Sequence, residues 1–393
     1  MTVAHAKLAI PGKKFRVSGH DLHFIYEPED RLQAILKLIA TAKKSVRMLF
    51  YMFDPDASGR EVLAALTEAA SRGLKVSLII DSFGSSGTPH AFFEPLLAEG
   101  GQYHCFGSRW GVGYFVRNHQ KILIIDDRHA LIGGYNITDQ YFGRKGEESW
   151  EDLGLVVTGA EVPKLAGYYD ELHRLSADGS VPFKTMRKLT RDWHPGAGKL
   201  KWLVGGPTNR MSSWGLSLKQ TMQNASHIDI VAAYFSPSQT VLRRIAKVTH
   251  RANGSRLVMA GKSDNGATIG AARLLYRYLL KRKAKIYEFQ PRPLHSKLFI
   301  VDDVVFIGSA NLDVRSLFIN LEIMLRIEDA SFASHMRGFV DEMVAQSEPQ
   351  TTALLARRDS YWTRFKSAFA YFLVNTVDYT IGRRIRFGVL PRR

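Results

Sequence analysis

The chain has 393 residues, of which 45% are hydrophobic and 23% charged, a composition typical of soluble globular proteins. This composition excludes a collagen-like fibre, a coiled coil and a disordered chain, and at about 150 residues per domain the length predicts two or three domains. Lys and Arg number 54 against 37 Asp and Glu, a formal net charge of +17. Such an excess predicts an anionic partner, either nucleic acid or an acidic membrane surface.

The single cysteine, Cys105, excludes an internal disulfide and a cysteine-based zinc cluster, and we expect it to be a partly buried thiol in a reducing compartment. The first residues contain no continuous apolar region, so no secretory signal is predicted. No run of 18 apolar residues occurs, so no membrane-spanning helix is predicted either. We therefore expect a soluble or peripheral protein.

Hydrophobic periodicity predicts helices and strands in alternation. In the first half we predict a helix at residues 31–41, a strand at 46–53, a helix at 60–71 and a strand at 75–81. In the second half the same order covers residues 216–224, 228–235, 239–251 and 256–260. This alternation predicts an α/β fold, with helices on both faces of a sheet.

The chain is predicted to consist of two similar halves. Residues 191–198 are rich in Gly and Pro and are expected to form a linker between them. We place the halves at residues 1–190 and 199–347, followed by a C-terminal segment at residues 348–393.

Each half contains the pattern H-x-K-x-x-x-x-D. The six matching residues are His119, Lys121 and Asp126 in the first half and His295, Lys297 and Asp302 in the second. Chance predicts roughly 0.04 such matches in a chain of this composition, so two matches indicate a shared function. Each motif is followed by an asparagine after small residues and then by a carboxylate, namely Asn136 and Asp152 in the first half and Asn311 and Glu322 in the second.

The spacing of the motif follows strand geometry. Residues two apart on a strand point to the same face, so His119 and Lys121 are expected to present an imidazole and an ammonium group side by side. Asp126 would mark the polar end of the strand and support the site from behind. The pairs Asp126-Asp127 and Asp302-Asp303 resemble a magnesium site, but aspartates at strand ends are more typical of turns.

This set of residues suits phosphodiester chemistry. One neutral histidine can attack phosphorus and form a phosphohistidine, while the other, protonated, donates to the departing oxygen. The two lysines would stabilise the charge that develops on the non-bridging oxygens, so we expect no metal and no other cofactor. Asn136 and Asn311 are candidates for substrate binding, and Asp152 and Glu322 for holding the second nitrogen of each imidazole.

The paired motif resembles that of the phospholipase D superfamily, and within it the sequence is most similar to bacterial cardiolipin synthases. Residues 117–122 resemble their R-N-H-x-K stretch, and residues 308–316 with 320–322 resemble their second-motif segment; the likeness covers roughly residues 20–345. The longer synthases begin with two transmembrane helices, which this chain does not show. Around Asp152, the sequence Ser-Trp-Glu-Asp stands where an Arg–Asp pair is usual.

The resemblance implies two packed α/β halves with one active site at their interface, with His119 as the nucleophile and His295 as the acid and base. It implies a phosphatidyltransferase that makes cardiolipin from phosphatidylglycerol, and possible further phospholipid donors, through a phosphatidyl-histidine intermediate. Three alternatives remain open: a phospholipase D that uses water and releases phosphatidic acid, a nuclease of the same superfamily, and a membrane-binding module without activity. The second-motif segment argues against nucleic acid as the partner.

The C-terminal segment predicts how the protein would reach lipid. Aromatic and apolar residues recur at helical spacing over residues 361–376, and five arginines follow over residues 383–393. An aromatic amphipathic helix beside clustered arginine suits an anionic bilayer, although the same helix could dock on the core of the protein. Residues 110–116 could form an apolar lip or a buried connection. We expect peripheral association with the cytoplasmic face of the membrane; the oligomeric state stays open.

Overall fold

The structure is a computed structural model that describes residues 10–107, 116–144, 146–179, 181–208, 210–251, 254–263 and 266–358. The predicted C-terminal amphipathic helix lies outside the described residues, and so does the apolar segment 110–116 except for Val116.

The first half contains β1 (Lys13–Val17), β2 (His20–Ile25), α1 (Pro28–Ala40), β3 (Ser45–Phe50), α2 (Ala57–Ser71), β4 (Lys75–Asp81), η1 (His90–Phe93), α3 (Glu94–Ala98), β5 (Gln102–Phe106), β6 (Ile122–Ile125), β7 (His129–Gly133), η3 (Asp139–Tyr141), η4 (Gly146–Glu148), β8 (Gly154–Thr158), α4 (Val162–Ala177) and α5 (Phe183–Arg191). The second half contains β9 (Leu200–Gly205), α6 (Ser213–Thr221), β10 (Ile228–Ala232), β11 (Phe235–Ser236), α7 (Gln239–Arg251), β12 (Arg256–Ala260), α8 (Gly266–Leu280), β13 (Lys285–Phe289), β14 (Lys297–Val301), β15 (Val304–Gly308), β16 (Leu312–Asp313), α9 (Val314–Phe318), β17 (Glu322–Glu328), α10 (Ala330–Ala345), β18 (Ser347–Gln350) and α11 (Thr352–Arg358).

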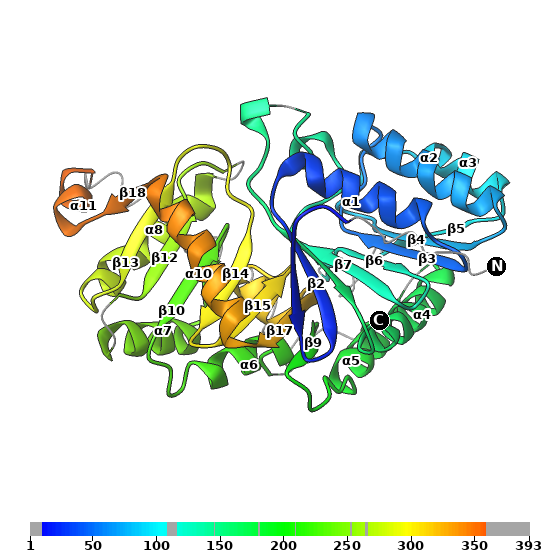
Figure 1. Cartoon of the computed structure of the whole chain (residues 1–393). Helices are drawn as coiled ribbons and strands as arrows, with labels where there is room; N and C mark the ends of the chain where they lie inside the picture. Colours follow the sequence, from blue (N-terminus) through cyan, green and yellow to red (C-terminus); the bar gives the residue numbers. More distant parts are fainter. Residues whose placement is uncertain are drawn as a thin grey trace, which may run out of the picture.

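Each half folds around one eight-stranded sheet, and seven strands of each sheet repeat the same order, with β1 and β18 added at opposite edges (Figure 1). The first runs β1-β2-β8-β7-β6-β3-β4-β5, and the second, read from its other edge, runs β9-β17-β15-β14-β10-β12-β13-β18. Within them β3, β4 and β5, like β10, β12 and β13, are parallel, whereas the neighbours β6 to β8 and β14 to β17 are antiparallel. The predicted duplication of an α/β unit is therefore confirmed.

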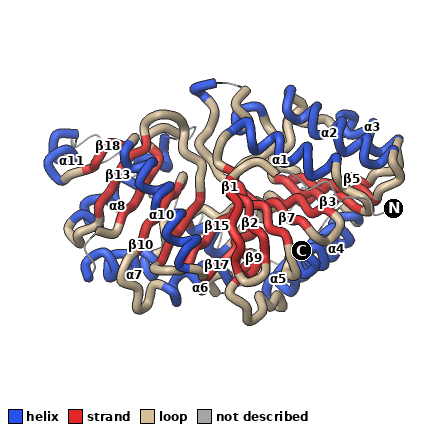
Figure 2. The backbone as a smooth tube through the Cα atoms, in the orientation of Figure 1, coloured by secondary structure: helices blue, strands red, loops and turns tan. Residues whose placement is uncertain are grey.

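Helices cover both faces of each sheet, as predicted, and the inner faces share a core. In β3, Met48 packs under α1 and α2, whereas its neighbour Leu49 faces the inner core, because successive strand residues point to opposite faces. That inner core contains α4 and α10 together with residues of both sheets, such as Ile122 and Ile300. Helices α6, α7 and α8 pack on the outer face of the second sheet, and Figure 2 shows the two sheets side by side.

The predicted elements at residues 75–81, 239–251 and 256–260 are confirmed as β4, α7 and β12. The strands predicted at 46–53 and 228–235 are too long, since β3 ends at Phe50 and β10 at Ala232. Beyond these points the backbone leaves each sheet and pairs with other segments: Phe53 bridges to Ile137, and β11 pairs with β16. Residues 192–199, between α5 and β9, form neither a helix nor a strand.

Candidate active site

A cavity of about 500 Å³ lies between the two halves and is lined by residues of both. The motif histidines His119 and His295 line it together, as do the two asparagines Asn136 and Asn311 that the sequence singled out. Residues from the equivalent strand starts of the two halves therefore line one cavity.

Both motifs begin in extended segments that lead into a strand. His119 and Lys121 come just before β6, and His295 comes two residues before Lys297, the first residue of β14. Gln120, between the first pair, is buried and donates to a tyrosine of α4, so it points the other way. In each motif the lysine ammonium reaches the carbonyl of its own histidine, at 2.7 Å for Lys121, which places ammonium and imidazole on one face.

Each motif histidine contacts a carboxylate from the opposite half. His119 Nδ1 lies 3.1 Å from both carboxylate oxygens of Glu322, and His295 Nδ1 lies 2.6 Å from Asp152 Oδ2. These contacts fix the tautomer in which Nδ1 carries the proton and Nε2 is left for chemistry. The sequence singled out both carboxylates, but their crosswise assignment comes from the structure.

Short backbone ladders between the halves explain this crosswise pairing. The His119 amide donates to the Leu321 carbonyl at 2.9 Å, and Glu322 is the next residue. In the same way the His295 amide donates to the Glu151 carbonyl at 2.8 Å, and Asp152 follows. The backbone thus positions each imidazole beside a carboxylate of the other half.

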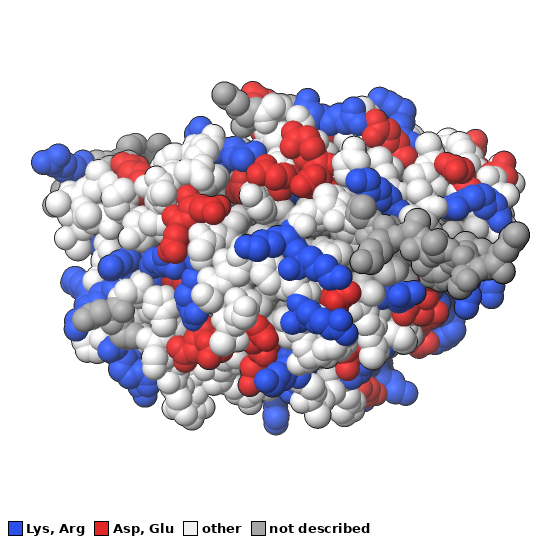
Figure 3. All heavy atoms as spheres, in the orientation of Figure 1, with Lys and Arg blue, Asp and Glu red and all other residues white. Residues whose placement is uncertain are grey.

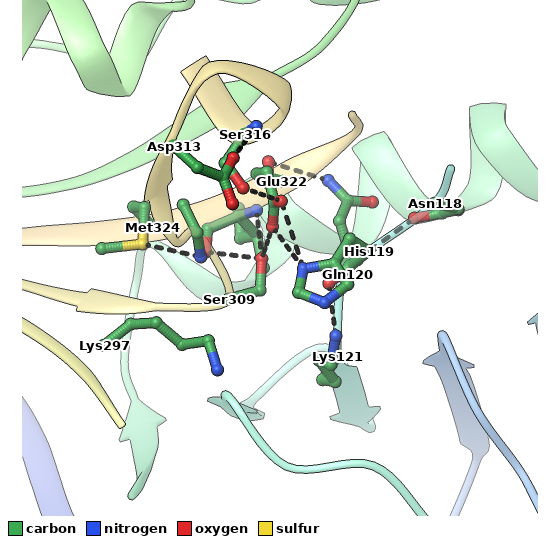
Figure 4. Close-up of polar contacts among 12 residues, drawn as sticks. Asn118, His119, Gln120, Lys121, Lys297, Ser309, Asp313, Ser316, Glu322 and Met324 are labelled. Carbon is green, nitrogen blue, oxygen red and sulfur yellow. Dashed lines mark hydrogen bonds and ion pairs between the residues drawn. The ribbon is translucent and has the colours of Figure 1, made fainter. Parts of the chain in front are cut away.

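The two carboxylates are both fully buried but have different surroundings. Glu322 accepts hydrogen bonds from the hydroxyls of Ser309, at 2.5 Å, and Ser316, at 2.8 Å (Figure 4). Asp152 instead accepts from the backbone amide of Leu153 at 2.7 Å. At Gly134 a Cβ atom would lie 2.4 Å from Asp152 Oδ1, so glycine is required there by this close approach.

The cationic side chains of the site are two arginines that line the cavity, Arg117 and Arg315, and the two motif lysines, both of which are fully buried. Figure 4 shows the lysines reaching toward one side of the Glu322 cluster from the two halves. Burial lowers the pKa of Lys121 to about 7, with nearby Glu322 opposing and Lys297 adding to the shift. An anionic phosphate placed beside Lys121 would favour its charged form, because a nearby opposite charge stabilises an ammonium group.

Burial also favours the neutral form of both histidines. It lowers the pKa of His119, with Glu322 partly opposing the shift. It lowers the pKa of His295 to about 3, and Lys297, whose Nζ lies 2.8 Å from His295 Nδ1, adds to the effect. For Asp152, burial alone would raise the pKa, but Lys297 and His295 lower it overall, so its carboxylate is ionised.

The two asparagines that line the cavity differ in their hydrogen bonding. Asn136 accepts from the Met52 amide at 3.3 Å and donates to the Tyr141 hydroxyl at 3.3 Å. Asn311 is 4% exposed, and its Oδ1 has no hydrogen-bond partner among the described residues. The amide of Asn311 is therefore the better placed of the two to bind a ligand.

The motif aspartates, expected to mark the polar strand ends and to support the site from behind, do not line the cavity. Asp126 lies at the far end of β6, where its carboxylate accepts from the amides of Lys43, Lys44 and Ser45 at 2.7–2.9 Å. Asp302 does the same for the amides at the start of β10, at 2.8–3.1 Å. Each begins the turn after its strand with a positive φ, 55° and 48° respectively. They join a hairpin to its neighbouring strand, as turn residues do.

Sequence reasoning missed Arg31, a fully buried arginine in α1. Its guanidinium donates to the carbonyls of Tyr141 and Trp150 at 2.9 Å each, and also to those of Tyr26 and Asp152. One side chain therefore holds the segment that carries Asp152. A basic group lies beside this carboxylate although the local sequence lacks the usual Arg–Asp pair. No periodicity signals such a contact, since Arg31 belongs to a distant helix.

Aromatic rings around the histidines were also missed. Tyr51 lies edge-on to His119, with ring centroids 5.1 Å apart. Tyr141 and Trp150 each lie 5.3 Å from the His295 ring, and Tyr234 lies 6.4 Å from it. These rings line the cavity together with the two imidazoles. Tyr51 and Tyr234 each follow the first parallel strand of a half, which is the signal that could have identified them.

The sequence also provided no indication of Asp81, whose buried carboxylate lies at the end of β4. It accepts from the amide of Asn118 at 2.7 Å and from the amides of Phe83 and Gly84 at 2.9 and 3.0 Å. Burial raises the pKa of Asp81 to about 6, against the effect of these hydrogen bonds. Its role is to hold the backbone next to His119.

Over the part of the chain that the structure describes, the helices are all too short or too polar to cross a bilayer.

Comparison with known proteins identifies the family. Residues 35–171 and 218–344 match the family described as "Cardiolipin synthase, PLD-like domain", one match in each half. The chain is 27% identical over 373 residues to cardiolipin synthase B of Salmonella typhi and 28% identical over 376 residues to that of Escherichia coli K12, covering 93% of this chain and 90% of each relative. It is 28% identical to cardiolipin synthase A of Pseudomonas fluorescens SBW25, over 85% of this chain and 71% of that protein.

Solved structures agree with the fold. The crystal structure of phosphatidylserine synthase from Haemophilus influenzae Rd KW20 superimposes with a TM-score of 0.75 at 14% identity, over 92% of this chain and 94% of that one. Polyphosphate kinase from Porphyromonas gingivalis gives a TM-score of 0.58 at 13% identity, over 85% of this chain and 49% of that one. With its family matched in both halves, the chain belongs to the cardiolipin synthase group of phospholipase D-like proteins.

Proposed function

We propose that the protein is a phosphatidyltransferase that makes cardiolipin from phosphatidylglycerol through a phosphatidyl-histidine intermediate. The observation that carries the proposal is the pair of motif histidines on one cavity, each held at Nδ1 by a carboxylate of the other half. Two imidazoles with free Nε2 atoms can act as a nucleophile and as an acid and base. The cardiolipin synthase relatives support the choice of substrate.

In the first step, His119 Nε2 attacks the phosphorus of phosphatidylglycerol. The new P–N bond forms as the P–O bond to the headgroup glycerol breaks, and His295 gives its proton to the departing oxygen. His119 suits the nucleophile because burial keeps it neutral, and its side chain is 13% exposed against 6% for His295. The entering phosphate offsets the charge of Lys297, which raises the pKa of His295 and lets it carry a proton.

In the second step, a hydroxyl of a second phosphatidylglycerol attacks the same phosphorus. His295, now neutral, takes the proton of this hydroxyl, the P–O bond forms and the P–N bond to His119 breaks. The product is cardiolipin, and the proton on His295 is the one needed for the next cycle. Lys121 and Lys297 stabilise the non-bridging oxygens in both transition states.

This substrate places the protein at an anionic bilayer, where we expect peripheral association. Incubating the purified protein with phosphatidylglycerol vesicles tests the reaction. Cardiolipin and free glycerol are the expected products. Phosphatidic acid without cardiolipin would show that water is the acceptor and would refute the transferase proposal.

The two histidine roles can be separated with a phosphatidyl ester of p-nitrophenol, whose phenolate leaves without protonation. His119→Ala should abolish p-nitrophenol release, because no nucleophile remains. His295→Ala should retain one turnover of release but lose cardiolipin synthesis from phosphatidylglycerol. His250→Ala, an exposed histidine of α7, is the matched control. Release by His119→Ala equal to that of the wild type would refute the nucleophile assignment.

A further inference from the structure

A second cavity, of about 350 Å³, opens beside the catalytic one. We propose that it binds the phosphate-bearing glycerol headgroup of the acceptor phospholipid, an inference that rests on the proposed transfer reaction. It is formed where the loop carrying Gln140, Glu148 and Trp150 faces residues 291–293 and Lys262.

The position of this cavity relates it to the second step of the reaction. Gln140 and Trp150 line both cavities, so the two are neighbours. The Trp150 ring lies 5.3 Å from the ring of His295, and Pro293, which lines the second cavity, comes two residues before His295. A ligand in this cavity therefore lies next to the histidine that deprotonates the acceptor hydroxyl.

The charges in the cavity match a phosphate and a hydroxyl. Lys262 is exposed, with its Nζ 3.4 Å from the Pro291 carbonyl, and Arg292 also lines the cavity. Arg292 Nε pairs with Glu151 at 2.8 Å, so this neighbouring carboxylate is neutralised and does not repel an anion. The remaining carboxylate, Glu148, is exposed and can accept a hydrogen bond from a glycerol hydroxyl.

The two neighbouring cavities also suit a glycerophosphate unit. Pro293 lines the second cavity and His295, two residues later, lines the catalytic one. A glycerol unit carries its phosphate at one end and a hydroxyl at the other. A phospholipid acceptor can thus hold its phosphate at Lys262 and Arg292 while its hydroxyl reaches His295. Water and small alcohols cannot make both contacts, which favours transfer to lipid.

A competition between two acceptors tests this site. The full-length protein is supplied with phosphatidylglycerol vesicles containing ethanol, and the ratio of cardiolipin to phosphatidylethanol is measured for the wild type and for Lys262→Gln. Both products come from the same intermediate, but ethanol has no phosphate for Lys262 to bind. We expect the ratio to fall about 5-fold in Lys262→Gln, and further in the double variant with Arg292→Gln.

Lys247→Gln, an exposed lysine of α7 away from both cavities, is the matched control and should keep the wild-type ratio. An unchanged ratio in Lys262→Gln and in the double variant would overturn the acceptor site while leaving the transferase proposal intact. A wild type that forms phosphatidylethanol or phosphatidic acid but no cardiolipin would refute both.

Discussion

His119 and His295 are chemically equivalent residues in different electrostatic environments. Glu322, beside His119, accepts hydrogen bonds from two serine hydroxyls. Asp152, beside His295, is instead close to the positive charges of Lys297 and Arg31. A near-symmetric pair of motifs can therefore supply two different roles, because the surroundings of each carboxylate differ.

Removing the charge of Glu322 should impair catalysis without removing a substrate contact. Glu322→Gln is expected to lower kcat on the order of 10³-fold with little change in KM, because the amide neither fixes the Nδ1–H tautomer of His119 nor stabilises a charged ring. Initial rates on phosphatidylglycerol vesicles measure this effect. Glu328→Gln, at the exposed end of the same strand, should behave as wild type. A normal kcat in Glu322→Gln would contradict the role of this carboxylate.

Lys121 should set an alkaline limit on activity. Burial lowers its pKa to about 7, so in the free enzyme the ammonium is complete below that pH and is lost above it. We therefore expect kcat/KM to fall above about pH 7, whereas the limit on kcat should lie at higher pH, because bound phosphate stabilises the ammonium. Rate profiles from pH 5.5 to about 9 test this prediction. In Lys121→Arg the fall of kcat/KM above about pH 7 should disappear, since arginine stays charged. If the fall persists in that variant, it reports the titration of another group.

At the level of elements, the hairpins β6–β7 and β14–β15 depend on the aspartate that ends each motif. Asp126 and Asp302 cap the amides that open the neighbouring strands β3 and β10. The motif thus combines catalytic residues at one end of a strand with an anchor at the other. Positioning of the histidines depends on how firmly each strand is held in its sheet.

Asp302→Ala should reduce stability rather than chemistry. Loss of the acceptor for the Ser226 and His227 amides is expected to lower the free energy of unfolding by about 1–3 kcal/mol, seen as a lower melting temperature. Activity per folded molecule should stay near that of the wild type. Asp303→Ala, in the same turn, is the control and should melt normally. If Asp302→Ala melted normally but lost activity, this aspartate would be catalytic after all.

At the level of the whole molecule, the site exists because the inner faces of the two sheets share one core. Each histidine takes its carboxylate from the other half, so neither half contains a complete pair. On the face shown in Figure 3, basic and acidic side chains are interspersed and do not form one basic patch. The excess positive charge of +17 therefore does not form a single basic docking surface on this face.

The C-terminal residues 361–393, outside the described part of the chain, remain the predicted membrane contact. Deleting them is expected to weaken binding to anionic vesicles while leaving the melting temperature of the two halves unchanged, because aromatic residues and arginines at an interface add both apolar and electrostatic attraction. Flotation with phosphatidylglycerol vesicles measures binding, and neutral vesicles serve as the control. Unchanged flotation would show that this segment is not the anchor.

The sequence by itself determined what covalent geometry and local periodicity control. The duplicated motif, the alternation of helix and strand, and the same-face placement of His119 and Lys121 depend on residues a few positions apart, and all could be predicted. The boundaries of β3 and β10 could not, because they end where the chain pairs with distant loops.

Only the tertiary structure decided which residues the site side chains contact. The contacts of His119 with Glu322 and of His295 with Asp152 join residues 203 and 143 positions apart, and Arg31 reaches Asp152 across 121. The motif aspartates lie at the opposite strand ends, where their carboxylates accept hydrogen bonds from backbone amides of distant segments. The physical reason is common to all of these: a strand specifies which face a side chain takes, whereas the packing of the two sheets specifies what that face meets.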